Sequence, residues 1–258
     1  MQSTLRAAAQ PAISVVVPVC NEADNVAPLV REIVQALGPV PHEIIYVDDG
    51  STDGTVEVAR RVRAEGVPQL RLLRHSFRSG QSAAVASGIR AARAEWIATL
   101  DGDGQNDPAD LPALMAARQQ HPAVRLIMGN RVARRDTAMR RLQSRVANGV
   151  RSRLLGDGTP DTGCGIKLLH RETFIALPYF DHMHRFLPAL FQRAGAAVIS
   201  VPVRHRSRER GQSKYGLFDR LWVGIVDIAG VMWLRRRFRS GLAVVEDLQA
   251  SSPQETIR

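Results

Sequence analysis

The chain has 258 residues, of which 45% are hydrophobic, enough for one large domain or for a domain with appendages. Its 35 Lys and Arg against 25 Asp and Glu give a net charge of +10, which favours a polyanionic partner: nucleic acid, an anionic membrane or a phosphorylated substrate. Two cysteines exclude a disulfide scaffold and fit a reducing compartment. The N-terminal residues carry no secretory signal, and no apolar run is long enough to predict a transmembrane helix.

The first half of the chain alternates short β-branched runs with helically spaced apolar residues. The predicted strands are 13–17, which Pro18 is expected to end, 43–47, 69–73, 96–100 and 125–128. The predicted helices between them are 23–37, 55–64, 80–92 and 109–119. This alternation predicts a mostly parallel sheet covered by helices on both faces.

The second half is less regular. A basic amphipathic helix is predicted at 139–155, with arginines such as Arg151 on the solvated sides of an apolar stripe. The Gly- and Asp-rich segment that follows it predicts a loop. The remaining elements predicted from the pattern are a loop at 156–165, a helix at 187–193, a strand at 197–203, a charged loop at 204–214 and an apolar helix at 215–234.

Polar and acidic residues directly follow three of the predicted strands, at 18–22, 48–53 and 101–105. Ligands of open parallel sheets bind outside the carboxyl ends of the strands, so these segments are expected to converge on one edge. The Gly-rich dinucleotide motif is absent after the first strand, and no P-loop is present. Acidic groups in that place favour a metal-assisted nucleotide site.

Two carboxylates in this set have the spacing to share a cation. Asp101 and Asp103 can grip Mg²⁺ or Mn²⁺, hard ions that bridge carboxylates to phosphate oxygens. Glu22 and Asp49 can accept hydrogen bonds from a nucleobase edge or from ribose hydroxyls. The alternative for the segment 48–53 is a helix N-terminus with capping acids.

Taken together and in order, these motifs resemble family 2 glycosyltransferases of the GT-A fold, and within them the polyprenyl-phosphate (dolichyl-phosphate mannosyltransferase-like) sugar synthases. The resemblance covers roughly residues 12 to 235. The matching motifs are Val-Val-Val-Pro-x-x-Asn-Glu at 15–22, Val-Asp-Asp-Gly-Ser-Thr-Asp at 47–53, Asp-Gly-Asp-Gly-Gln-Asn-Asp-Pro at 101–108, Gly-Asn-Arg at 129–131, Asp-Thr-Gly-Cys-Gly-Ile-Lys at 161–167 and Arg-Glu-Arg-Gly-Gln-Ser-Lys-Tyr at 208–215.

The resemblance implies a GT-A, Rossmann-like catalytic domain at 12–214, after a flexible N-terminus at 1–11 and before a polar tail at 240–258. It implies a UDP- or GDP-sugar donor, a polyprenyl-phosphate acceptor and bound Mg²⁺ or Mn²⁺. The nucleotide-sugar residues would be Pro18, Val19, Asn21, Glu22, Asp48, Asp49, Asp101, Gly102 and Asp103. The metal residues would be Asp101, Asp103 and Gln105, and the phosphate and acceptor residues Arg131, Arg208, Ser213 and Lys214.

The acceptor decides which catalytic groups the reaction needs. A phosphate monoester is largely anionic at neutral pH because its second pKa is about 6, so it needs little help from a base. A hydroxyl acceptor on a glycan or lipid, the alternative, requires a carboxylate base. Asp161, with Asp103 one of two predicted catalytic residues, is the candidate for that base or for orienting an arginine or cation. Relatives often have Ser-Gly-Phe-Arg where this chain has Cys-Gly-Ile-Lys at 164–167.

The apolar helix near the C-terminus has an amphipathic pattern. Trp222 and Trp233 return to nearly the same face, with Asp227 on the opposite side, and an arginine cluster follows. This pattern favours a membrane-interface helix at 215–239 over a membrane span. The alternative is a helix buried against the domain or a partner. The expectation is a cytoplasmic protein attached peripherally to the inner membrane, able to form oligomers, and not a nucleic-acid-binding protein.

Overall fold

The computed structural model describes residues 10–132, 149, 151–206 and 217–237. In this part of the chain, seven strands form one sheet in the order β3-β2-β1-β4-β6-β5-β7. β6 runs antiparallel to both of its neighbours, and every other pairing is parallel. The strands are β1 (Ile13–Val19), β2 (His42–Asp48), β3 (Leu70–Arg74), β4 (Trp96–Thr99), β5 (Val124–Arg131), β6 (Lys167–His170) and β7 (Ala197–Val203).

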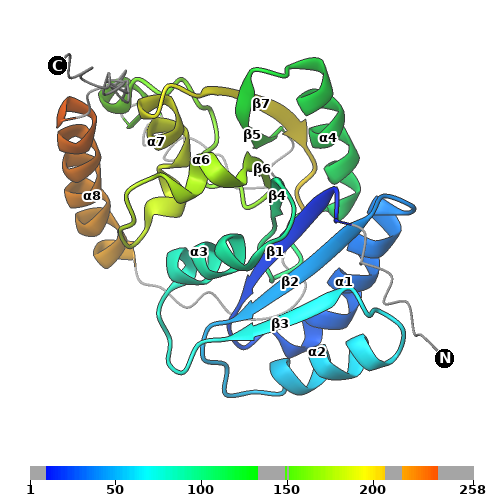
Figure 1. Cartoon of the computed structure of the whole chain (residues 1–258). Helices are drawn as coiled ribbons and strands as arrows, with labels where there is room; N and C mark the ends of the chain where they lie inside the picture. Colours follow the sequence, from blue (N-terminus) through cyan, green and yellow to red (C-terminus); the bar gives the residue numbers. More distant parts are fainter. Residues whose placement is uncertain (1–9, 133–148, 150, 207–216, 238–258) are drawn as a thin grey trace, which may run out of the picture.

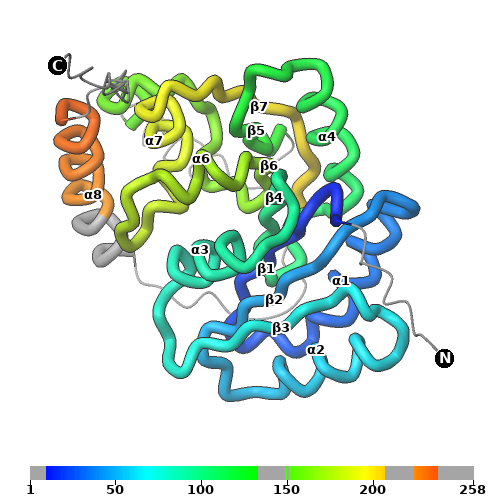
Figure 2. The backbone as a smooth tube through the Cα atoms, viewed as in Figure 1, coloured from blue at the N-terminus to red at the C-terminus, as the bar shows by residue number. Residues whose placement is uncertain are grey.

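Helices cover both faces of this sheet (Figure 1). One face packs against α1 (Ala23–Leu37), α2 (Thr55–Ala64) and α4 (Leu111–Gln120), the last preceded by the 3₁₀ turn η1 (Pro108–Asp110). The tube in Figure 2 shows the second layer on the opposite side. It consists of α3 (Gln81–Ala91), α6 (Arg171–Ile175), the 3₁₀ turn η2 (Met183–Arg185), α7 (Leu187–Arg193) and α8 (Leu217–Arg237).

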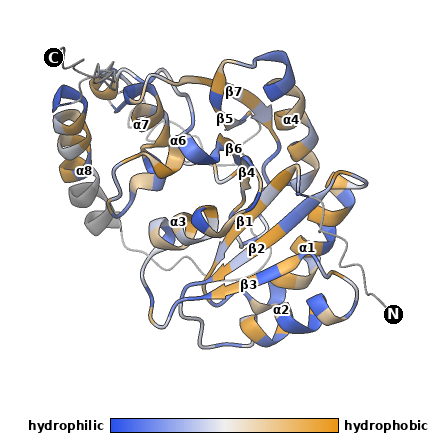
Figure 3. Cartoon of the chain, in the orientation of Figure 1, coloured by the Kyte–Doolittle hydropathy of each residue, from blue (hydrophilic) through white to orange (hydrophobic). Residues whose placement is uncertain are grey.

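The central strands are apolar on both sides because both of their faces are covered. In β1, Val15 and Val17 belong to the core under α1, while Val16 between them belongs to the core under α3. Such a strand reads as a continuous apolar run rather than as an alternating one. Figure 3 shows this hydrophobic colour along the central strands. The sheet is therefore a rigid platform for the loops at its carboxyl edge.

The structure confirms the predicted α/β class, corrects two strand boundaries and adds one strand. β1 continues through Pro18 to Val19, because its neighbour β4 ends at Thr99, opposite Val16, and no ladder bond is needed from the proline on that side. β5 extends to Arg131, so Gly-Asn-Arg ends the strand instead of following it. β6 was not predicted, because Leu168 and Leu169 are the only apolar residues in it and make no recognisable run.

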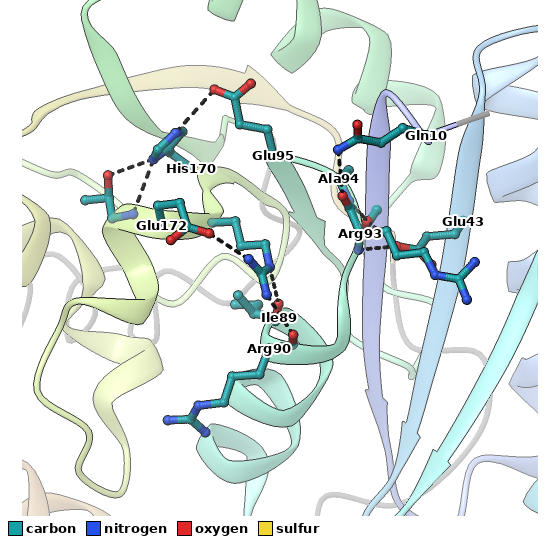
Figure 4. A network of polar contacts seen from close by, with 12 residues as sticks. Gln10, Glu43, Ile89, Arg90, Arg93, Ala94, Glu95, His170 and Glu172 are labelled. Carbon is teal, nitrogen blue, oxygen red and sulfur yellow. Dashed lines mark hydrogen bonds and ion pairs between the residues drawn. The ribbon is translucent and has the colours of Figure 1, made fainter. Parts of the chain in front are cut away.

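A polar network joins the amino ends of the strands, opposite the carboxyl edge, and Figure 4 shows part of it. The Glu43 carboxylate accepts hydrogen bonds from Ser14 Oγ at 2.7 Å, Arg71 Nη1 at 2.6 Å and the Arg93 amide at 2.6 Å. These donors come from β1, β3 and the α3–β4 connection. Despite burial, which opposes ionisation, these hydrogen bonds and the Arg71 charge hold the pKa of Glu43 below its ordinary value.

Two predictions about amphipathic helices have different outcomes. Most of the basic helix predicted at 139–155 lies outside the described residues; its last turn is helical, but Arg151 is buried against Asp157 and Leu154 is 47% exposed, so the expected stripe is wrong there. The buried carboxylate draws the arginine inward. In α8, Ile225, Val226 and Trp233 are exposed and Asp227 faces His182, as the spacing predicted, while the side chain of Trp222 lies outside the described residues.

Candidate active site

The loops after β1 and β2 interlock at the carboxyl edge of the sheet. The Asn21 amide donates to Ser51 Oγ at 2.8 Å, and the Thr52 amide donates back to Asn21 Oδ1 at 2.7 Å. The Glu22 amide donates to Thr55 Oγ1 at 2.9 Å, at the start of α2. Asn21 has a positive φ of 55°, a conformation that asparagine tolerates better than most residues. The predicted nucleotide-binding segments are thus joined by direct hydrogen bonds.

The loop after β4 packs against the same two loops. Gly102 lies directly on the Pro18 carbonyl and the Val19 side chain, where a Cβ would have no room. Gly104 approaches Asn25, whose side-chain amide donates to Glu22 Oε2 at 2.7 Å. The structure therefore brings the 101–105 loop and Glu22 to one place at the carboxyl edge.

Asp48 is the last residue of β2 and Asp49 follows it, and both carboxylates accept hydrogen bonds from other parts of the protein. Asp49 accepts three hydrogen bonds at 2.8 Å, from the amides of Ser79 and Gly80 and from His75 Nδ1. Asp48 is fully buried, accepts from the Ser51 amide at 3.3 Å and lies 3.8 Å from Arg74. The Asp49 carboxylate thus holds the loop that leads into α3, and Gln81, the first residue of that helix, contacts Asp101 in the β4 loop.

Asp101 is held from several sides. Its Oδ1 accepts from Gln81 Nε2 at 2.9 Å, and its backbone amide donates to Asn106 Oδ1 at 2.9 Å. Gly165 packs against its carboxylate so closely that no Cβ fits. Burial raises the pKa of Asp101 above its ordinary value, although the charge of Lys167 opposes this shift. The Asp103 carboxylate accepts from the Gln105 amide at 3.1 Å and is only partly buried.

Arg131, at the end of β5, makes a bidentate ion pair with Asp161. Its Nε donates to Asp161 Oδ2 at 2.6 Å and its Nη2 donates to Oδ1 at 2.7 Å. Burial alone would disfavour the guanidinium charge, but the hydrogen bonds and charge of Asp161 keep the pKa of Arg131 above its ordinary value. Of the two roles predicted for Asp161, this geometry favours orienting an arginine over acting as a base.

Three predicted acceptor residues, Arg208, Ser213 and Lys214, lie outside the described residues. Conversely, Gln81 and Lys167 line a small cavity together with Asp101, and neither was predicted to belong to the site. Gln81 opens a helix and carries no motif. The sequence offered one signal for Lys167, the Gly-Ile-Lys run that departs from the Ser-Gly-Phe-Arg of relatives.

The donor atoms suit a cation that is shared with a ligand. Within the described ranges, no group of three His, Cys, Asp or Glu residues has the geometry to hold a metal ion by itself. Mg²⁺-type ions, however, are commonly bound by one or two carboxylates together with substrate phosphates. Asp101 and Asp103 supply two carboxylates on one short loop at the sheet edge, so the residues present fit an ion that is bridged to a diphosphate.

An open α/β sheet with interlocked polar loops at its carboxyl edge, and paired carboxylates after the fourth strand, has the architecture of the GT-A fold. The sequence profile "Glycosyl transferase family 2" matches residues 14–177. The chain belongs to this family and is a glycosyltransferase.

Named relatives refine this class. Dodecaprenyl-phosphate galacturonate synthase of Rhizobium johnstonii is 37% identical over 87% of this chain and 67% of its own length. Undecaprenyl-phosphate 4-deoxy-4-formamido-L-arabinose transferase of Edwardsiella ictaluri is 33% identical over 80% of this chain and 63% of its own length. The chain thus spans about two thirds of the length of these relatives, both of which are named for polyprenyl-phosphate sugar transfer.

A solved structure has the same fold at lower identity. Glucosyl-3-phosphoglycerate synthase of Mycobacterium tuberculosis, in complex with Mn²⁺, UDP and phosphoglyceric acid, superposes with a TM-score of 0.66 at 19% identity, over 89% of this chain and 80% of its own. The same enzyme has also been solved with Mg²⁺ and UDP. At this identity the likeness establishes the fold.

Proposed function

We propose that this protein transfers a sugar from a nucleoside diphosphate to a polyprenyl phosphate, with inversion and with a divalent cation. The observation that carries the proposal is the convergence of the 101–105 loop, the Glu22 loop and the N-terminus of α3 on one edge of the sheet. Two relatives above 30% identity, each named for a polyprenyl-phosphate sugar transferase or synthase, support the acceptor class.

The reaction needs an oxygen nucleophile and a stabilised leaving group. In the proposed step, an acceptor phosphate oxygen attacks the anomeric carbon of the sugar while the bond from that carbon to the diphosphate breaks, and the bonding electrons leave with the nucleoside diphosphate. A divalent cation bound at Asp101 and Asp103 would offset the charge that develops on the diphosphate. Both products are phosphate esters, and no proton has to be removed from the attacking oxygen.

Arg131 is proposed to contact phosphate near the acceptor. It lies at the carboxyl end of β5, and its charge is secured by Asp161. With Asp161 oriented toward the guanidinium, the site holds a cation for an anionic acceptor instead of a base for a hydroxyl. This contact is the reason to prefer a phosphate acceptor to the hydroxyl acceptor of a glycan.

The outer face of α8 is proposed to meet the cytoplasmic surface of the inner membrane. Ile225, Val226 and Trp233 are 51%, 56% and 59% exposed, and Arg236 and Arg237 are exposed at the end of the helix. Exposed apolar residues beside a basic cluster suit anionic lipid headgroups. Among the residues the structure describes, no helix has the length and apolarity needed to span a membrane.

Turnover with defined substrates tests the proposal. The purified protein is incubated with radiolabelled UDP- and GDP-sugars, Mn²⁺ or Mg²⁺, and either undecaprenyl phosphate or undecaprenol, and label in the organic phase is counted. Product is expected with the phosphate alone, and it should disappear with EDTA or in Asp103→Asn. Transfer to the free alcohol instead would favour the alternative acceptor, and full activity in EDTA would remove the metal from the mechanism.

Membrane contact is tested separately. Sedimentation with phosphatidylglycerol vesicles is expected to retain the wild-type protein, and Trp233→Ser should release several-fold more of it into the supernatant. Ile175→Ser, at an apolar position that is 39% exposed on α6, is the matched control and should sediment like the wild type. Equal sedimentation of all three proteins would contradict the assignment of α8.

A further inference from the structure

Lys167 is an unusual charge in this chain. It is one of two lysines, with Lys214, among 35 Lys and Arg residues. It opens β6, opposite Thr99 on β4, and is 6% exposed. Its ammonium group donates a hydrogen bond to the Cys164 carbonyl. A buried cation needs nearby negative charge, and its surroundings show where that charge lies.

Two carboxylates act on Lys167, of which the more strongly interacting is Asp101. Burial lowers the pKa of Lys167, and the charge of Asp101 is the largest influence opposing that shift, ahead of Asp161. Asp161 already has its own cation in Arg131, through two short hydrogen bonds. Lys167 and Asp101 line the same small cavity, and Lys167 is the cation that acts most strongly on Asp101, ahead of Arg131. Asp103 adds a second negative charge beside Asp101.

The space around Lys167 is small. Lys167 lines a partly open cavity of about 20 Å³ together with Asp101, Gln81 and His184. A cavity of that size holds about one water molecule and has no room for a sugar or a phosphate group. Any effect of Lys167 on ligand binding must then pass through the charge of the acidic centre.

We propose that Lys167 is a resident counter-charge that makes cation binding at Asp101 and Asp103 depend on the diphosphate. The inference rests on the proposed function, because it concerns the same cation site. The fixed ammonium lowers the attraction of the two carboxylates for a lone divalent cation through like-charge repulsion. A diphosphate that arrives with the cation restores the balance by adding negative charge. The site is thereby kept from binding a cation in the absence of the nucleotide-sugar.

The test is calorimetric titration of the full chain, with Mn²⁺ alone and with Mn²⁺ in the presence of UDP or GDP. Lys167→Gln removes the charge and keeps a donor for the Cys164 carbonyl, while Lys167→Met removes both. Arg151→Gln is the matched control, since Arg151 is 7% exposed, almost as buried as Lys167, but pairs with Asp157, and Asp101 is not among the charges that act on it. Circular dichroism verifies that each variant is folded.

Wild type is expected to bind Mn²⁺ alone at least tenfold more weakly than in the presence of nucleotide. Both Lys167 variants should bind Mn²⁺ alone on the order of tenfold more tightly than wild type, and Arg151→Gln should not. Lys167 variants with unchanged or weaker Mn²⁺ binding would overturn the inference. If the variants do not fold, wild type binding Mn²⁺ equally with and without nucleotide would overturn it too. Absence of nucleotide binding to wild type with any cation would instead overturn the proposed function.

Discussion

The substitution Asp161→Asn separates the two roles that the sequence left open for this residue. The carboxylate accepts hydrogen bonds from Arg131 Nε at 2.6 Å and from Nη2 at 2.7 Å, and the two side chains are 7% and 13% exposed. An asparagine keeps one oxygen acceptor and loses the charge. A positioning role predicts that the damage falls on Arg131 and on whatever that arginine binds.

The magnitude follows from the burial of the pair. Removing one partner of a buried ion pair costs about 3–5 kcal/mol, because the other charge is left uncompensated. The retained amide oxygen and the slight exposure of Arg131 place Asp161→Asn near the lower end, about 3 kcal/mol. Urea unfolding should show this as a lower midpoint with an unchanged slope. The KM for polyprenyl phosphate should rise about tenfold or more, with a smaller change in kcat.

The chain supplies its own control in a second buried pair. Arg151 Nη1 donates to Asp157 Oδ2 at 2.5 Å, with side chains 9% and 0% exposed. Asp157→Asn should lose a similar stability and leave the KM unchanged, because Asp157 is hydrogen-bonded to Arg151 and Thr159 and not to Arg131. A general base would give the opposite kinetic result for Asp161→Asn: kcat lost by orders of magnitude with KM intact, whereas the loss of stability is expected for either role. That outcome would refute the positioning role.

Three further predictions follow from the packing. Gly165→Ala should push the Asp101 carboxylate aside and reduce nucleotide affinity about tenfold or more in calorimetry, while a wild-type affinity would contradict the contact. Burial holds the pKa of His184 well below 6.5, so the unfolded state takes up the proton first as pH falls. The free energy of unfolding should therefore drop below pH 6.5 by about 1.4 kcal/mol per pH unit until the folded-state pKa is reached. The slope should be shallower in His184→Gln. Glu43→Ala should cost about 3 kcal/mol in urea unfolding, because three donors lose a buried acceptor, whereas Glu95→Ala, at a side chain 63% exposed, should stay within about 0.5 kcal/mol.

Local pattern was enough to predict most of the sheet. The continuous apolar runs of β1 and β2 and the 3.6-residue spacing of α1 are properties of short segments, so their type and order could be read from the residues. The acidic segments after β1, β2 and β4 could be assigned to one edge because parallel strands share a direction. The family resemblance, carried by the same motifs, was confirmed by the match over residues 14–177.

Tertiary structure decided which charged side chains are paired within the protein and which can act on a ligand. Asp49 and Asp101 sit in similar sequence contexts. The Asp49 carboxylate accepts hydrogen bonds from the loop before α3, whereas the Asp101 carboxylate lies beside Lys167 and Gly165. Arg151 was expected in solvent and is buried because a carboxylate six residues later folds back onto it. Sequence determines which residues carry charge and on which element they lie; only the folded chain sets the burial and the partners that decide what each charge does.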